Sequence, residues 1–284
     1  MAIKIVTDSS CDLPRELVAQ YGITVVPLRM WWDNETYLDG VDFTAREFFA
    51  RLSASDTLPK TSQPSIGDFV EAYRGLVRAG HSVISIHVSS MLSGTYNCAH
   101  MAKEMVGGDI QVVDSEHISL GMGFQVLEAA RAAVLESKAE VLRVISSARR
   151  SMRMVCCLPT LEYLRKSGRI GDLAAFIGTL LSIKPLIAVE KGRLVSTERA
   201  RGFRHAISRM VDSVTTGLPK GARHVVGVMH AATRETADWL QDEMKRRLQP
   251  VEVLVIETGP AIGTYSGPGG VGIAVYQRWR GFHG

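Results

Sequence analysis

The sequence predicts an α/β protein in which a parallel sheet comes first and a mixed or antiparallel sheet follows. Short apolar segments alternate with helical ones up to about residue 153, an order typical of a parallel sheet with helices on both faces. After that point, strand candidates follow one another without regular helices between them, which predicts hairpins. We therefore expect two closely packed domains, residues 1–153 and 154–284.

The expected elements follow from apolar periodicity and from capping and turn residues. Capping boxes at Thr44 and Ser65 predict two helix starts, and Gly192 predicts a hairpin turn at 190–193. Asp172 is expected to cap an apolar helix over 173–182. Strands are expected at 3–6, 23–28, 83–88, 110–113, 154–157, 184–189, 193–197, 225–229, 251–258 and 272–277. The longer helices are expected at 66–79, 99–106, 119–136, 139–150, 203–217 and 233–248, and a short one at 159–165. Residues 59–65 are expected to form a loop, and a glycine-rich turn is expected before the last strand.

Composition narrows the class of protein. The formal net charge of +4 is too small to indicate a nucleic-acid partner, and no apolar run reaches the roughly 18 residues of a membrane span. The chain enters a strand pattern at once, which leaves no room for a signal peptide. Its four cysteines form neither a CxxC pair nor a zinc spacing. We expect a cytoplasmic protein without a membrane span.

Several common catalytic motifs are absent or misplaced. A GxGxxG match at 267–272 precedes a strand-like segment instead of opening a helix, so it is not a dinucleotide fingerprint. The chain has no P-loop, and the glycines and serine at 263–267 miss the spacing of a nucleophile elbow. No histidine pattern indicates a metal site. We expect neither a metal nor a cofactor.

Polar residues instead follow three strands of the predicted parallel sheet. They occupy residues 7–10, 89–93 and 114–115, and the carboxyl ends of parallel strands are where ligands bind in open α/β sheets. Ser93 occupies the expected N-cap position of a helix, and Gly94 lets a ligand approach the backbone, so this loop is a candidate anion site. The alternative is that these residues only cap helices and form turns.

Two histidines bear on whether a serine here is catalytic. His87 lies within an apolar strand and is expected to be a satisfied core residue. His230 ends a strand and is the better candidate for a site. A hydrolase or transferase with Ser93 as nucleophile and His230 or another histidine as base therefore stays open as an alternative.

Six motifs in order resemble the DegV family over essentially the whole chain. They are TDSS with DLP at 7–14, TSQPS at 61–65, SSMLSGTY at 89–96, DS at 114–115, LRKSGRI at 164–170 and GPG at 267–269. Such proteins are similar to the fatty-acid-binding subunit of bacterial fatty acid kinase. The resemblance implies a two-domain carrier, not itself an enzyme, that holds one long-chain fatty acid in an internal tunnel.

The resemblance also implies a partner and a set of site residues. A separate ATP-dependent kinase would phosphorylate the carboxylate to an acyl phosphate for phospholipid synthesis. Thr61 and Ser93 would hydrogen-bond the carboxylate beside Gly94, and Arg201 would lie near the kinase-facing surface. The family often has a histidine where this chain has Tyr265, whose phenol can donate a hydrogen bond but brings no positive charge.

Two segments with small residues, 121–124 and 173–178, are suitable walls for an acyl tunnel. Without the resemblance, ordinary helix packing against a sheet would be the preferred explanation of both. A regulatory lipid-binding protein without a kinase partner is a further alternative to the kinase subunit.

Overall fold

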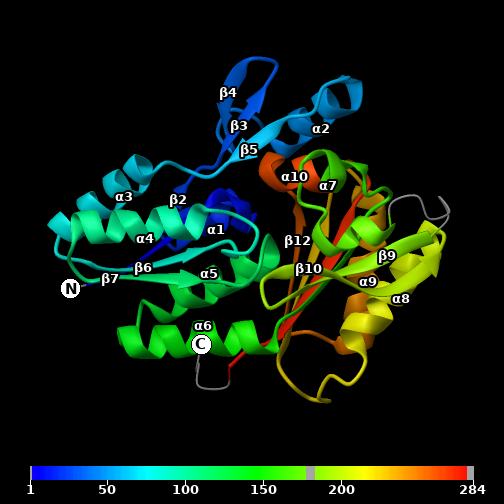
Figure 1. The fold of residues 1–284 in the computed structure, drawn as a ribbon. Helices are drawn as coiled ribbons and strands as arrows, with labels where there is room; N and C mark the ends of the chain where they lie inside the picture. Colours follow the sequence, from blue (N-terminus) through cyan, green and yellow to red (C-terminus); the bar gives the residue numbers. More distant parts are fainter. Residues whose placement is uncertain (1, 177–182, 280–284) are drawn as a thin grey trace.

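The computed structural model describes residues 2–176 and 183–279 (Figure 1). The strands are β1 (Ile3–Asp8), β2 (Thr24–Val26), β3 (Arg29–Trp32), β4 (Glu35–Leu38), β5 (Lys60–Ser62), β6 (Ser82–His87), β7 (Ile110–Asp114), β8 (Arg153–Cys157), β9 (Ile183–Glu190), β10 (Arg193–Arg201), β11 (His224–His230), β12 (Glu252–Glu257) and β13 (Val271–Gln277). The α-helices are α1 (Arg15–Gln20), α2 (Ala45–Ala54), α3 (Ile66–Arg78), α4 (Thr95–Val106), α5 (Leu120–Ala132), α6 (Lys138–Ser151), α7 (Glu162–Lys166), α8 (Phe203–Thr215), α9 (Arg234–Leu248) and α10 (Pro260–Ser266). Two short 3-10 helices are η1 (Ser9–Cys11) and η2 (Gly171–Phe176).

The first sheet is parallel, as the alternation of strands and helices predicts. Its order is β2-β1-β6-β7, and the central strand β6 is buried along its whole length. Helices α3 and α4 cover one face, and α5 and α6 cover the other (Figure 1). The capping boxes at Thr44 and Ser65 are both formed, so the helix starts at α2 and α3 are confirmed.

A small antiparallel sheet of order β4-β3-β5 stands apart from the first (Figure 1). Asp33 and Asn34 both have positive φ and form the tight turn between β3 and β4. Strand β5 lies in the segment that the sequence analysis treated as a loop, and it pairs with β3 through Thr61 opposite Met30. Trp32 of this sheet packs on Phe48 of α2, with ring centroids 5.7 Å apart.

The second large sheet is mixed, in the order β10-β9-β8-β13-β11-β12. Only β11 and β12 run parallel; the other neighbours are antiparallel, which confirms the predicted second sheet. Lys191 and Gly192 both have positive φ and form the predicted turn between β9 and β10. Helices α8 and α9 cover one face of this sheet.

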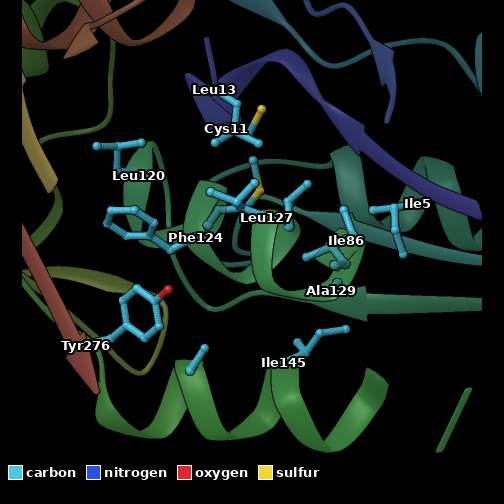
Figure 2. Packing of buried hydrophobic residues seen from close by; sticks show 14 of the residues in the cluster. Ile5, Cys11, Leu13, Ile86, Leu120, Phe124, Leu127, Ala129, Ile145 and Tyr276 are labelled. Carbon is cyan, nitrogen blue, oxygen red and sulfur yellow. The ribbon is translucent and has the colours of Figure 1, made fainter. Parts of the chain in front are cut away.

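Helix α5 packs between the two large sheets (Figure 2). Its Phe124 ring lies 5.1 Å from the ring of Tyr276 on β13. A Cβ on Gly227 of β11 would come within 2.7 Å of Phe124, so this glycine allows the helix to approach the sheet. Both sheets thus share one hydrophobic core, while the division into domains 1–153 and 154–284 stays a prediction.

Three expectations need correction. Residues 260–266 form α10, although the sequence analysis expected only a glycine-rich turn before the last strand. Helix α7 begins at Glu162, later than the expected residue 159. Asp172 lies in the first turn of η2 instead of capping a regular helix, and residues 177–182 of the expected helix lie outside the described part.

Candidate functional site

Ser93 lies in the loop between β6 and α4 and lines a polar cavity. Gly94, and not Ser93, is the N-cap residue of α4, which corrects the expected cap. The Ser93 hydroxyl lies 2.8 Å from Thr95 Oγ1 and accepts a hydrogen bond from the Thr95 N–H at 3.3 Å. The loop therefore holds the serine beside the first turn of the helix, where its hydroxyl can still donate to a ligand.

Gly94 does not line the same cavity, but it lies against a residue that does. A Cβ at this position would lie 3.1 Å from the side-chain amide nitrogen of Gln63, which is a cavity residue. The absence of a side chain at Gly94 therefore leaves room for Gln63. Whether Gly94 also approaches a ligand stays a prediction.

Thr61 and Tyr265 both line this cavity. Thr61 is on β5 and Tyr265 is near the end of α10, and their hydroxyls hydrogen-bond to each other. Together with Ser93, they bring three hydroxyl groups from three separate segments to one cavity. The structure thus places together the three polar side chains named from the sequence, and their contact with a fatty acid stays a prediction.

Two aspartates hold the N-terminus of α10. Asp12 Oδ1 accepts the Gly259 N–H at 2.8 Å, and Asp39 Oδ1 accepts the Ala261 N–H at 2.9 Å. Both aspartates come from the first half of the chain. Their hydrogen bonds therefore attach the start of α10, the helix that carries Tyr265, to that half. Carboxylates at a helix N-terminus also interact favourably with its dipole.

Burial raises the pKa of the Asp12 carboxyl to about 7, although hydrogen bonds from Ser119 and Gly259 favour its ionised form. Asp39 nearby contributes a like charge, and burial raises the pKa of Asp39 as well. The two carboxyls also line a cavity of about 620 Å³ beside α1 and β12. Because charged groups line this larger cavity, it is unsuited to an acyl chain.

An apolar cavity adjoins the polar one. It lies on the face of the mixed sheet opposite α8 and α9, beneath α7 and α10, and its lining is almost wholly apolar. The two cavities share five lining residues, so the polar groups lie next to an apolar space. The shared residues are Ile118, Leu164, Leu194, Ile262 and Tyr265.

Within the described part of the chain, the residues of the predicted tunnel walls do not line this space. A Cβ on Gly123 would come within 2.5 Å of the Cys11 carbonyl oxygen, so that glycine serves helix packing. Leu173 is buried in a hydrophobic cluster with Leu158 and Leu164, and residues 177–178 lie outside the described part. Ordinary helix packing therefore explains the described residues of both segments.

Arg169 is a cavity residue whose role the sequence analysis did not identify. Its guanidinium is exposed at the polar cavity and donates to the Leu92 carbonyl oxygen at 3.3 Å. It brings a positive charge next to Ser93 that Tyr265 does not supply. The signal was present in the basic loop at 164–170, but only the folded chain places that loop beside residues 92–93.

His87 is a satisfied core residue, as expected. It is fully buried, with Nδ1 2.9 Å from Asp8 Oδ2 and Nε2 2.6 Å from Ser85 Oγ. His230 lines the apolar cavity and not the polar cavity that contains Ser93.

Arg201 ends the edge strand β10, is exposed and lines neither cavity. The structure therefore does not bring it together with the three hydroxyls, and its expected role at a partner surface stays a prediction.

A family comparison decides the identity. The DegV family model, described as "Uncharacterised protein, DegV family", matches residues 2–278. The chain belongs to the DegV family. A DegV domain-containing protein of Caldanaerobacter subterraneus is 35% identical over 279 residues, covering 97% of this chain and 99% of its own. A DegV domain-containing protein of Staphylococcus aureus is 33% identical over 277 residues, which cover 96% of this chain and 98% of the relative.

Solved DegV structures have the same fold. A Thermus thermophilus DegV family protein described by its fatty acid binding has a TM-score of 0.89 at 33% identity, covering 98% of this chain and 100% of its own. A DegV fatty acid binding protein of Bacillus subtilis has a TM-score of 0.88 at 32% identity, and the match covers 98% of this chain and 99% of that protein. A stearic acid-binding protein of Eubacterium ventriosum has a TM-score of 0.91 at 26% identity, and the match covers 99% of this chain and 100% of that protein.

Two further properties concern only the described ranges. Within residues 2–176 and 183–279, no three His, Cys, Asp or Glu side chains are arranged to hold a metal ion. Every helix in those ranges is too short or too polar to cross a lipid bilayer.

Proposed function

We propose that this DegV protein carries one long-chain fatty acid and presents its carboxylate to a separate ATP-dependent kinase in the cytoplasm. The kinase would form an acyl phosphate for phospholipid synthesis. The observation that carries the proposal is the apolar cavity that shares lining residues with a cavity to which Thr61, Ser93 and Tyr265 bring hydroxyl groups. The fatty-acid-binding DegV structures with the same fold support the ligand class.

The two cavities match the two parts of a fatty acid. Each methylene group moved from water into an apolar site contributes about 0.8 kcal/mol, so the apolar cavity favours a long chain. A carboxylate loses hydration in the polar cavity and needs donors there. The Thr61, Ser93 and Tyr265 hydroxyls and the Arg169 guanidinium are among the donors that line it.

The serine hydrolase alternative finds less support. Ser93 Oγ has Thr95 as its partner, and no histidine lies within hydrogen-bond distance of it among the described residues. His230 lines the apolar cavity and not the polar cavity that contains Ser93, so the described residues include no serine–histidine pair there.

A coupled assay tests the kinase proposal. The protein loaded with oleate would be incubated with a cognate fatty acid kinase and ATP, and acyl phosphate would be trapped with hydroxylamine. We expect acyl hydroxamate only when all three components are present. Binding of oleate without acyl phosphate formation would instead support the regulatory lipid-binding protein.

Arg201 provides a variant for the partner surface. Because Arg201 is exposed and outside both cavities, Arg201→Ala should leave oleate affinity unchanged and reduce acyl phosphate formation at limiting kinase. Arg204→Ala, which removes an exposed arginine three positions away, serves as the control. Equal rates for both variants would contradict a partner role for Arg201.

A further inference from the structure

One cation lies among the side chains that line the two cavities. Of the described residues that line the polar and the apolar cavity, only Arg169 is an arginine, lysine, aspartate or glutamate. Backbone carbonyls hold its guanidinium: Nε donates to Leu92 at 3.3 Å and Nη1 to Ser167 at 3.3 Å. Arg165 on the preceding turn instead pairs with Glu162. Within the described ranges, no carboxylate of this chain neutralises the charge of Arg169.

The polar cavity has an exposed side, and Arg169 belongs to it. Arg169, Ser62 and Gln63 line the cavity and are exposed. Ser10 and Ala261 line the same cavity and are buried. A group that another protein delivers approaches from the side of the exposed residues, where Arg169 supplies the positive charge.

The hydroxyls and the guanidinium suit different anions. The Thr61, Ser93 and Tyr265 hydroxyls are neutral donors, which suit the single charge of a carboxylate. A phosphoryl group carries a charge of about −1.5 to −2 near pH 7 and three acceptor oxygens. The planar fork of an arginine can donate two parallel hydrogen bonds to such oxygens, and it adds the charge that the hydroxyls lack.

We propose that Arg169 binds the phosphoryl group that is transferred to the fatty acid, and so stabilises the acyl phosphate in the polar cavity. The inference rests on the proposed function. In the transfer, a carboxylate oxygen bonds to the terminal phosphorus of ATP, the bond from that phosphorus to the bridging oxygen breaks, and ADP leaves with the electron pair. Because negative charge is spread over the outer oxygens of the phosphoryl group during this step, a fixed guanidinium beside them favours it.

Paired affinities test this inference without the kinase. Dissociation constants would be measured for stearic acid and for stearoylmethylphosphonate, a stable analogue of stearoyl phosphate in which a methylene group replaces the bridging oxygen. We expect Arg169→Gln to raise the Kd for the analogue about tenfold or more relative to stearic acid, because a hydrogen bond to a charged group is lost. Arg169→Lys keeps the charge without the fork and should retain part of the preference. Lys166→Gln, which removes a nearby exposed cation outside both cavities, should leave the ratio unchanged.

Two results would overturn the inference. One is the same ratio of the two dissociation constants in the wild type and in Arg169→Gln, since Arg169 would then act on the carboxylate or on the fold. The other is an equal change of that ratio in Lys166→Gln, which would indicate a general effect of surface charge. A wild type that binds no stearic acid would instead show that the proposed function has failed. Retained stearic acid binding also shows that each variant is folded.

Discussion

The hydroxyl groups of Thr61 and Tyr265 hydrogen-bond to each other although 204 positions separate the two residues. The contact joins β5 of the small sheet to α10, which follows the last parallel strand of the mixed sheet. The candidate head-group site therefore exists only when these distant segments are docked. Its properties should depend on the residues that hold α10 as well as on those that touch the ligand.

Substituting Tyr265 tests the phenol that stands where the family often has histidine. Tyr265→Phe removes a donor to an ionised carboxylate, so we expect oleate affinity to fall by about 1.5–3 kcal/mol. Tyr265→His should make affinity higher at pH 6 than at pH 8, because a histidine of ordinary pKa near 6.5 gains a positive charge at the lower pH. Isothermal titration at both pH values measures this, with Tyr96→Phe outside the cavity as control. A pH-independent Tyr265→His variant would contradict the placement.

Substituting Ser93 tests the serine loop. Ser93→Ala removes a hydroxyl donor to the carboxylate, and we expect the Kd for oleate to rise about 10- to 150-fold. Ser90→Ala is the matched control, because Ser90 lies in the same loop and lines neither cavity. If the two variants retain oleate and support phosphorylation equally well, Ser93 has no such role.

Asp12 should give the protein an unusual dependence of stability on pH. Its folded-state pKa of about 7 exceeds the ordinary value of 3.8, so the folded state binds the extra proton between those pH values. The contribution of Asp12 to the free energy of unfolding should therefore fall as pH rises from about 4 to about 7, by at most about 1.4 kcal/mol per pH unit.

Denaturant titrations of the wild type and Asp12→Asn isolate this contribution. The difference in unfolding free energy should shift in favour of Asp12→Asn as pH rises through that window, because asparagine cannot ionise. Asp56→Asn, at an exposed carboxylate, should show no such trend. A difference between wild type and Asp12→Asn that stays constant from pH 4 to pH 7 would contradict the account.

A charged network joins α5 to the mixed sheet. The Glu128 side chain is 4% exposed and pairs with Arg131 at 2.7 Å and with Arg278 at 3.0 Å. Glu128→Gln leaves these guanidiniums partly uncompensated, so we expect a loss of about 3 kcal/mol in the free energy of unfolding. Glu140→Gln, which breaks a pair with the exposed Arg143, should cost less than about 1 kcal/mol in the same titration. Equal losses would show that the network does not support the core.

Local signals in the sequence predict most of the fold. The capping boxes at Thr44 and Ser65 and the turn at Gly192 act over a few residues, so a short sequence window contains the whole cause. Helix α10 was missed because Gly263 and the glycines that flank it suggest a turn. That helix instead depends on Asp12 and Asp39, more than 200 positions away, which hold its first N–H groups.

The candidate site shows the same limit. Thr61, Ser93 and Tyr265 could be named from motifs, because each motif is local. Arg169 could not be assigned to the cavity, because only the fold places its loop against Leu92. The described residues of the predicted apolar walls also do not line the cavity: the glycines of α5 serve packing, while strands of the mixed sheet, α7 and α10 contribute to its lining.

Native mass spectrometry of the protein purified from bacteria, followed by organic extraction, tests the central claim most directly. We expect a mass increment equal to one long-chain fatty acid per chain, and the same acid in the extract. Ser93→Ala should retain less of it. A protein that emerges empty, and that binds neither added oleate nor added palmitate, would contradict the account.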